Sequence, residues 1–199
     1  MPTNSATSSS VTAVILAGGA GRRMAGQDKG LIPLQGKPLI HYVLGRLAGQ
    51  TGKLLINCNR NQQAYARFGY PLLQDSMAGG LGPLAGLLVA LEQSDSEFVL
   101  SVPCDTPYLP RDLIPRMLAT LQQEHAQACT VSDGERLHPV IMLVHRDAAP
   151  GLKHYLESGK RKVHDWYYSV AHCSTDFSDQ PQAFVNINTP DQLEQAEQS

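Results

Sequence analysis

The sequence predicts an α/β fold in which a mostly parallel sheet lies between two layers of helices, a three-layer αβα arrangement. Strand-like apolar runs alternate with helical patterns along most of the 199-residue chain. This alternation is typical of parallel strands that are joined by helices. The chain is 42% hydrophobic, which is enough for a buried core.

Seven segments have the length and apolar composition of strands, with turn residues at their ends. They are, in order, Val11–Leu16, Lys53–Cys58, Pro71–Gln74, Glu97–Val102, Ala128–Ser132, Leu137–His145 and Phe184–Asn186. Asp133-Gly134 is a tight-turn pattern between two of these segments. We therefore expect one antiparallel hairpin to interrupt the parallel order.

Helices are expected where apolar residues recur at 3.6-residue spacing, as in residues 38–48, 83–93 and 111–124. The third segment contains Pro115, which a helix tolerates only in its first turn. Thr189-Pro190 predicts a last helix, with an N-cap followed by proline at the first helical position. The apolar positions are Leu39, Ile40, Val43, Leu44 and Leu47, then Leu84, Leu87, Leu88 and Leu91, and then Leu113, Met117, Leu118 and Leu121.

The chain reads as one domain over residues 11–199, preceded by a disordered arm of small polar residues at 1–10. The arm carries no Lys or Arg, and the apolar stretch after it ends at Gly18. Both features argue against a signal peptide or a membrane span, so we expect a cytoplasmic protein.

Charge and metal-ligand spacing exclude several classes of function. The chain has 16 Lys and Arg against 18 Asp and Glu, a formal charge of −2, which does not suit a protein that coats nucleic acid. The four cysteines form no Cys-x-x-Cys pair and are expected to be buried free thiols. The histidines show no zinc-hydrolase pattern.

The segment from Leu16 to Gly30 is a glycine-rich loop with three cations, Arg22, Arg23 and Lys29. Glycines let backbone N–H groups approach an anion, and the cations can follow a polyphosphate. Met24 stands where a dinucleotide-binding loop needs its third glycine, and Gln27-Asp28 replaces the Lys-Ser of an NTPase loop. The loop is interpreted as an anion site, with a flexible turn and a solvated basic patch as the alternative.

Polar residues follow several strands, at the edge where parallel sheets bind ligands. Asp105 is the best candidate for a magnesium ligand, because a carboxylate can hold the ion while waters and phosphates complete its shell. The alternative is that Asp105 caps a turn or a helix. Asn57 and Asp75 follow the second and third strands, and Asn186 and Asn188 follow the last. A turn role is the alternative for Asp75, Asn186 and Asn188.

The loop from Leu16 to Lys29 resembles the motif L-A-G-G-x-x-x-R-M-x-G-x-D-K of the molybdenum cofactor guanylyltransferases. The resemblance continues to the last helix. The further matching segments are Asn57-Cys58-Asn59-Arg60, Asp75-Ser76, Gly82-Pro83-Leu84-Ala85-Gly86, Pro103-Cys104-Asp105-Thr106-Pro107-Tyr108, His138-Pro139 and Phe184-Val185-Asn186-Ile187-Asn188-Thr189-Pro190.

This resemblance implies a Rossmann-like nucleotidyltransferase fold and transfer of GMP from GTP to the terminal phosphate of molybdopterin, with release of pyrophosphate. It implies Mg²⁺ as cofactor and hand-off of the product to molybdoenzymes and their chaperones. Arg23, Lys29 and Asp105 are the expected catalytic residues. The nucleotide and the second substrate are expected to contact Leu16, Ala17, Gly18, Gly19, Lys29, Asn57, Asp75, Gly82, Asp105, Asn186 and Asn188.

Other interpretations stay open. The rivals are a cytidylyl- or sugar-nucleotidyltransferase of the same fold and a non-catalytic module that binds a nucleotide or cofactor. Asp75 is our hypothesis for recognition of guanine, whose N–H groups need acceptors. Lys160-Arg161-Lys162 could meet the phosphate of a pterin or be a solvated helix face. His138 could be functional or structural.

Overall fold

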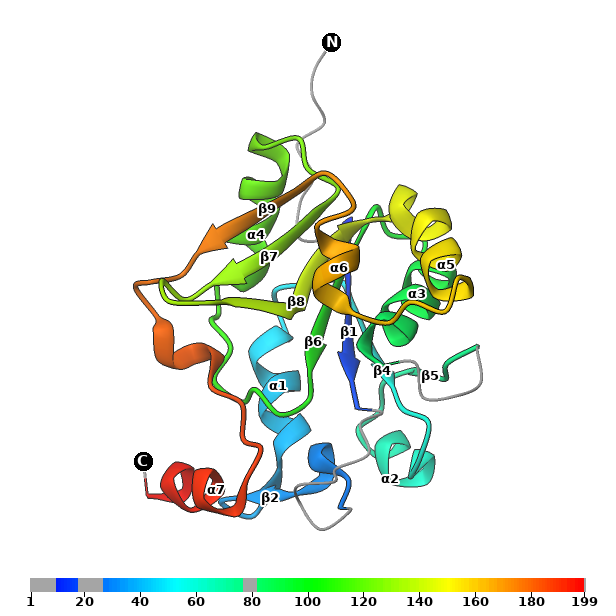
Figure 1. Ribbon diagram of the computed structural model, residues 1–199. Coiled ribbons are helices and arrows are strands. Elements are labelled where there is room, and N and C mark those ends of the chain that lie inside the picture. Colours follow the sequence, from blue (N-terminus) through cyan, green and yellow to red (C-terminus); the bar gives the residue numbers. More distant parts are fainter. Residues whose placement is uncertain (1–9, 18–26, 77–81, 199) are drawn as a thin grey trace.

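The computed structural model describes residues 10–17, 27–76 and 82–198. Its main feature is a seven-stranded sheet with the order β5-β4-β1-β6-β8-β7-β9 (Figure 1). The strands β5, β4, β1 and β6 are parallel, β8 runs antiparallel to both β6 and β7, and β9 is parallel to β7. The predicted α/β class, with a local antiparallel strand, is confirmed.

The strands agree closely with the sequence prediction, except at one edge of the sheet. Phe184–Asn186 was predicted as a strand, and this is wrong, because Phe184 ends a 3-10 helix, η5 (Pro181–Phe184). The edge strand is instead β9 (His172–Asp176). It escaped prediction because an edge strand with largely exposed residues lacks the apolar run of a central one. The other strands are β1 (Val11–Leu16), β4 (Lys53–Asn57), β5 (Leu72–Leu73), β6 (Phe98–Pro103), β7 (Ala128–Ser132) and β8 (Leu137–His145).

The predicted helices form with their apolar faces buried. Every apolar position predicted for α1 (Leu39–Leu47), α3 (Pro83–Gln93) and α4 (Leu113–Gln123) is buried. Pro115 lies in the first turn of α4, where its missing N–H leaves no helical bond unmade. The last helix, α7 (Pro190–Glu197), begins with Thr189 as N-cap in a capping box with Gln192.

Helices cover both faces of the sheet, which gives the predicted three layers. On one face, α1 and α4 pack in a core that includes Val11, Ala13 and Ile15 of β1. On the other, α3 packs with α5 (Ala149–Glu157) and α6 (Val163–Tyr167) in a core that includes Val14. The alternation along β1 is the two-residue period of a strand buried on both sides.

The hairpin predicted at Asp133-Gly134 is confirmed between β7 and β8. Gly134 has a φ of +94°, a backbone conformation that glycine adopts without strain. The small elements are a two-stranded sheet of β2 (Pro33–Leu34) and β3 (Lys37–Pro38), the helix α2 (Gln62–Ala66), and the 3-10 helices η3 (Lys29–Leu31) and η4 (Arg146–Ala148). The last helix contacts β2.

The cysteines are free thiols, as predicted; three are buried and Cys173 on β9 is half-buried. No helix in the described part of the chain is both long and apolar enough to span a membrane. Residues 1–9, most of the predicted N-terminal arm, lie outside the described residues.

Candidate active site

The carboxyl ends of β1, β4 and β6 lie side by side and bring together residues that the sequence places far apart. Leu16, the last residue of β1, is in register with Asn57 of β4 and with Pro103 of β6. The Ala17 N–H donates to the Asn57 carbonyl at 2.8 Å, and the Cys104 N–H donates to the Leu16 carbonyl at 3.2 Å. Leu16, Ala17 and Asn57, which were predicted to contact the nucleotide, therefore share one edge of the sheet with the segment that leads into Asp105.

Lys29 links two other predicted site residues, Asp105 and Asn188. Its ammonium Nζ lies 3.2 Å from Asp105 Oδ2 and also donates to Asn188 Oδ1. The backbone reinforces this junction, because the Ile187 N–H donates to the Asp105 carbonyl at 2.9 Å. The segment before α7 is thus held against the loop after β6, and a charged lysine lies where both meet.

Asp105 is a buried carboxylate with one oxygen left for another partner. Its side chain is 8% exposed, and burial raises its pKa although the nearby Lys29 charge opposes the shift. Oδ2 accepts from Lys29, whereas Oδ1 is buried and has no hydrogen-bond partner in the described part of the chain. An orphaned anionic oxygen of this kind suits a cation.

This arrangement fits magnesium if substrate supplies most of the ligands. Among the described residues, no group of three or more His, Cys, Asp or Glu side chains could hold a metal ion. Mg²⁺ is commonly held by one or two carboxylates together with phosphates and waters. A single free oxygen on Asp105 meets that requirement.

A second group of polar residues lies at the ends of β4 and β5. Asp75 accepts from Asn57 Nδ2 at 3.0 Å through Oδ1 and from Asn59 Nδ2 at 2.8 Å through Oδ2. The Asp75 N–H in turn donates to Asn59 Oδ1 at 2.9 Å. The carboxylate is half-buried and holds both amides in place, so its free lone pairs are oriented.

Glycine at 86 is required by the close approach of α3 to this group. A Cβ on Gly86 would lie 2.5 Å from Asn57 Oδ1 and 2.7 Å from Leu16 Cδ2. Gly82, just before the helix, has a φ of +76°, which also favours glycine. The Gly-Pro-Leu-Ala-Gly segment therefore serves to bring the start of α3 against the ends of β1 and β4.

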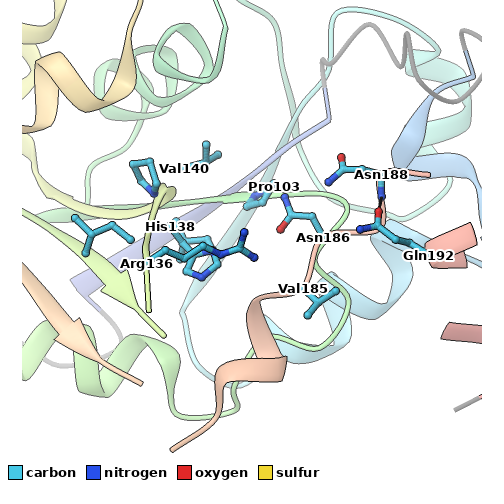
Figure 2. A pocket seen from close by; sticks show the side chains of 11 residues that line it. Pro103, Arg136, His138, Val140, Val185, Asn186, Asn188 and Gln192 are labelled. Carbon is cyan, nitrogen blue, oxygen red and sulfur yellow. Dashed lines mark hydrogen bonds between the residues drawn. The ribbon is translucent and has the colours of Figure 1, made fainter. Parts of the chain in front are cut away.

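A cavity of about 290 Å³ opens beside the Lys29 junction. Figure 2 shows Asn186 between Asn188 and Gln192 at one end and His138 and Arg136 at the other. Asn186 Oδ1 accepts from Thr106 Oγ1 at 3.2 Å. Both predicted asparagines therefore line the cavity. The remaining lining residues are Pro103, Leu137, Pro139, Val140, Ile141 and Val185.

Two groups of interacting residues near the site were not predicted from the sequence. His138 Nε2 lies 2.7 Å from Asp133 Oδ2 beside the cavity. The sequence singled out His138 before Pro139 and the Asp133-Gly134 turn separately, but it gave no signal that the two side chains meet. Asp28 is buried and accepts from Tyr65 Oη and from Asn61 Nδ2. These hydrogen bonds fix Asp28, the residue next to Lys29. Their donors lie in and just before α2, more than 30 residues along the chain, and nothing in the local sequence predicted the contact.

The structure leaves four of the predicted residues untested and places the basic run at 160–162 away from the cavity. Gly18, Gly19, Arg22 and Arg23 lie outside the described residues. The basic run at 160–162 lies between α5 and α6 and does not line the cavity. Arg161 Nη1 donates to the carbonyl oxygens of Leu156 and Lys160, which favours a cap at the end of α5 over contact with a pterin phosphate.

Comparison with known proteins gives one consistent family. Residues 13–173 match the family model of the MobA-like NTP transferase domain. The chain is 49% identical to the molybdenum cofactor guanylyltransferase of Shewanella loihica over 186 residues, which is 93% of this chain and 94% of that protein.

Solved structures share the fold. The molybdopterin-guanine dinucleotide biosynthesis protein A of Archaeoglobus fulgidus superposes with a TM-score of 0.79 at 24% identity, over 94% of this chain and 97% of that one. The 4-diphosphocytidyl-2C-methyl-D-erythritol synthase of Anaerococcus prevotii gives a TM-score of 0.74 at 12% identity, over 96% of each chain. At these identities the likeness concerns the nucleotidyltransferase fold.

Proposed function

The chain belongs to the MobA-like NTP transferase family, and from this membership we propose that it is a molybdenum cofactor guanylyltransferase. It transfers GMP from GTP to the terminal phosphate of molybdopterin and releases pyrophosphate. The main structural support for this reaction is the contact of Lys29 with Asp105 and Asn188. These three residues lie between the strand ends and the cavity. A transferase needs two substrates to meet at such a point.

Lys29 and Asp105 act on the phosphates. The Lys29 ammonium stabilises negative charge on the α-phosphate of GTP and on the pyrophosphate that leaves. Arg23 of the preceding loop is expected to add a second cation to the same phosphates. Transfer of this kind depends mainly on position and charge, so the protein needs no covalent nucleophile.

Asp105 is proposed to hold Mg²⁺ through the oxygen that Lys29 leaves free. The bound ion supplies charge neutralisation for the phosphate oxygens. Lys29 keeps the other carboxylate oxygen engaged, so the side chain is oriented before substrate arrives. Burial disfavours the charged carboxylate, and a cation beside it offsets that cost.

GTP is proposed to bind over the ends of β1, β4 and β5. Leu16, Ala17 and the loop glycines at 18 and 19 would face the phosphates and ribose, with Gly82 beside them. Asn57 and Asp75 would face the base, because guanine presents N–H donors that need acceptors. The hydrogen bonds between Asn57 and Asp75 support a preorganised acceptor there.

Molybdopterin is proposed to bind in the cavity beside Asn186 and Asn188. An amide can hold a phosphate or a metal-bound water without adding charge, and Asn188 already contacts Lys29. The terminal phosphate of the second substrate would enter at this end. We place the reaction in the cytoplasm, where GTP is made, with the product passed on to molybdoenzymes and their chaperones.

The decisive experiment incubates the purified protein with Mg²⁺, molybdopterin and each NTP in turn, and follows pyrophosphate release. Release with GTP, dependent on molybdopterin and Mg²⁺, is expected. Release with CTP and not with GTP would favour a cytidylyl relative. No release with any NTP would favour a non-catalytic binding module.

A further inference from the structure

The turn between β7 and β8 holds a carboxylate and an imidazole in a defined orientation beside the cavity. Asp133 Oδ1 accepts from the N–H groups of Glu135 at 2.9 Å and Arg136 at 2.8 Å. Its other oxygen, Oδ2, lies 2.7 Å from His138 Nε2. Oδ2 also lies 3.5 Å from Arg136 Nε. The two oxygens therefore have separate roles: Oδ1 closes the turn, and Oδ2 faces the histidine and the Arg136 guanidinium.

Asp133 is held as a carboxylate. Burial on its own would favour the neutral form, but the hydrogen bonds from Arg136, His138 and Glu135 outweigh it and lower the pKa of Asp133. A carboxylate only accepts hydrogen bonds, so the hydrogen between the two side chains lies on His138 Nε2. In a neutral imidazole the other nitrogen, Nδ1, is then an acceptor.

Nδ1 is the ring nitrogen of His138 that stays free for another partner. Within the described part of the chain Nδ1 makes no hydrogen bond, and it is not among the buried unpartnered atoms. The ring itself is fixed, since its side chain is 10% exposed and packs on Phe184 with ring centroids 5.2 Å apart. His138 lines the cavity (Figure 2), so a fixed ring with a free acceptor nitrogen lies beside whatever fills it.

We propose that the Asp133 and His138 pair determines specificity for the second substrate, with His138 Nδ1 accepting a hydrogen bond from an N–H group of the pterin ring. This deepens the proposed function and depends on it for the identity of the ligand. A phosphate at neutral pH is rich in acceptors and would need a donor at this place. At the opposite end of the cavity Asn188 lines the wall and contacts Lys29, so donors and charge for the phosphate are present there. Arg136 lines the His138 end, where its Nε lies 3.5 Å from Asp133 Oδ2 and is paired with that carboxylate.

The variant Asp133→Asn tests this because it reverses the polarity of Nδ1. The two backbone N–H groups require an oxygen at the Oδ1 position, so the amide NH₂ of the variant faces His138. The imidazole then accepts at Nε2 and carries its hydrogen on Nδ1. The turn keeps its hydrogen bonds, whereas the cavity now meets a donor in place of an acceptor.

The first measurement is binding of a phosphate-free pterin, 6-hydroxymethylpterin, followed by its fluorescence. We expect Asp133→Asn and His138→Phe each to weaken binding roughly 10-fold, as for a lost hydrogen bond opposite a polar group. The matched control is Asp147→Asn, which alters an exposed carboxylate 3.5 Å from His145 outside the cavity. Equal binding by the wild type and Asp133→Asn, or none by the wild type, would overturn the proposal.

The second measurement is steady-state transfer with molybdopterin and GTP. In Asp133→Asn we expect the KM for molybdopterin to rise roughly 10-fold, while the KM for GTP and kcat stay near the wild-type values. A lower KM for molybdopterin would mean that the ligand presents an acceptor, such as a phosphate oxygen, to His138. An unchanged KM would mean that the pair does not contribute to molybdopterin binding, and either result would refute the pterin assignment. Pterin binding is measured without GTP, so failure of the guanylyl transfer itself is distinguished from failure of this proposal.

Discussion

Lys29 Nζ lies 3.2 Å from Asp105 Oδ2, and this ion pair joins residues 76 positions apart in the chain. The lysine belongs to the end of the glycine-rich segment and the aspartate to the loop after β6. A cation of the proposed phosphate site and the proposed magnesium ligand are thus in direct contact before any substrate binds. Each constrains the other, which makes the pair the first target for mutation.

Replacing Lys29 with an uncharged residue should slow the transfer step. Lys29→Met removes the charge expected to stabilise the developing phosphate charge, and we expect kcat to fall about 100-fold or more. The measurement is pyrophosphate release at saturating GTP and molybdopterin. Lys37→Met, at an exposed lysine of β3, is the control and should retain full activity. A wild-type kcat in Lys29→Met would remove Lys29 from the mechanism.

Asp105→Asn should abolish activity without destabilising the fold. The pKa of Asp105 is raised in the folded protein, so its ionisation opposes folding, and that cost grows as pH rises from the unfolded value of about 3.9. Removing the charge should raise the thermal midpoint at pH 7 by about 2–4 °C. The gain should vanish below about pH 4. A midpoint lower than that of the wild type at pH 7 would indicate a structural role.

Gly86→Ala should damage the nucleotide site specifically. The added methyl group would meet Asn57 Oδ1 at 2.5 Å and Leu16 Cδ2 at 2.7 Å, so Asn57 must move. We expect the KM for GTP to rise about 10-fold and stability to fall by about 1–3 kcal/mol. Gly45→Ala in α1 is the matched control, because its new methyl group meets nothing within 4 Å. That variant should gain roughly 0.5–1 kcal/mol.

Asp75→Asn should weaken discrimination of GTP from ATP. The variant exchanges one acceptor oxygen for an NH₂ group between Asn57 and Asn59, both of which donate to Asp75. Losing an acceptor opposite the N–H groups of guanine should cost about 1–3 kcal/mol. The ratio of kcat/KM for GTP to that for ATP is the measurement, and Asp95→Asn on the surface is the control. If the variant kept the wild-type ratio of GTP to ATP, Asp75 would not recognise the base.

The Asp133 and His138 pair should contribute to stability in a pH-dependent way. Hydrogen bonds lower the pKa of Asp133 in the folded protein despite its burial. The carboxylate therefore stabilises the fold above its unfolded pKa of about 3.9, and this is lost as pH falls toward the lower folded value. Urea unfolding should show Asp133→Asn to be roughly 1 kcal/mol less stable than the wild type at pH 7, with a smaller difference at pH 3. If the variant lost the same stability at pH 3 as at pH 7, the pKa of Asp133 would not be lowered in the folded protein.

Much of the fold follows from local sequence. The bounds of β1, β7, β8 and α3 agree with the predicted ranges, because a buried strand or helix repeats its apolar residues at its own period. The meeting of Leu16, Asn57 and Pro103 at the strand ends was also predictable, since the carboxyl ends of parallel strands lie at one edge of a sheet. The edge strand β9 was missed because it buries too little to carry a clear pattern.

By itself the sequence determined the fold class, the family motif and which residues could form the site. Only the tertiary structure decided which of them touch: Lys29 reaches Asn188 across 159 positions of sequence, and Gly86 leaves room for Asn57. It also decided that Asp133 orients His138 toward a cavity. The physical reason is the distance along the chain over which each interaction acts. Periodicity and turn chemistry act over a few residues, whereas hydrogen bonds and close packing between distant segments depend on how the layers of the sheet and helices pack together.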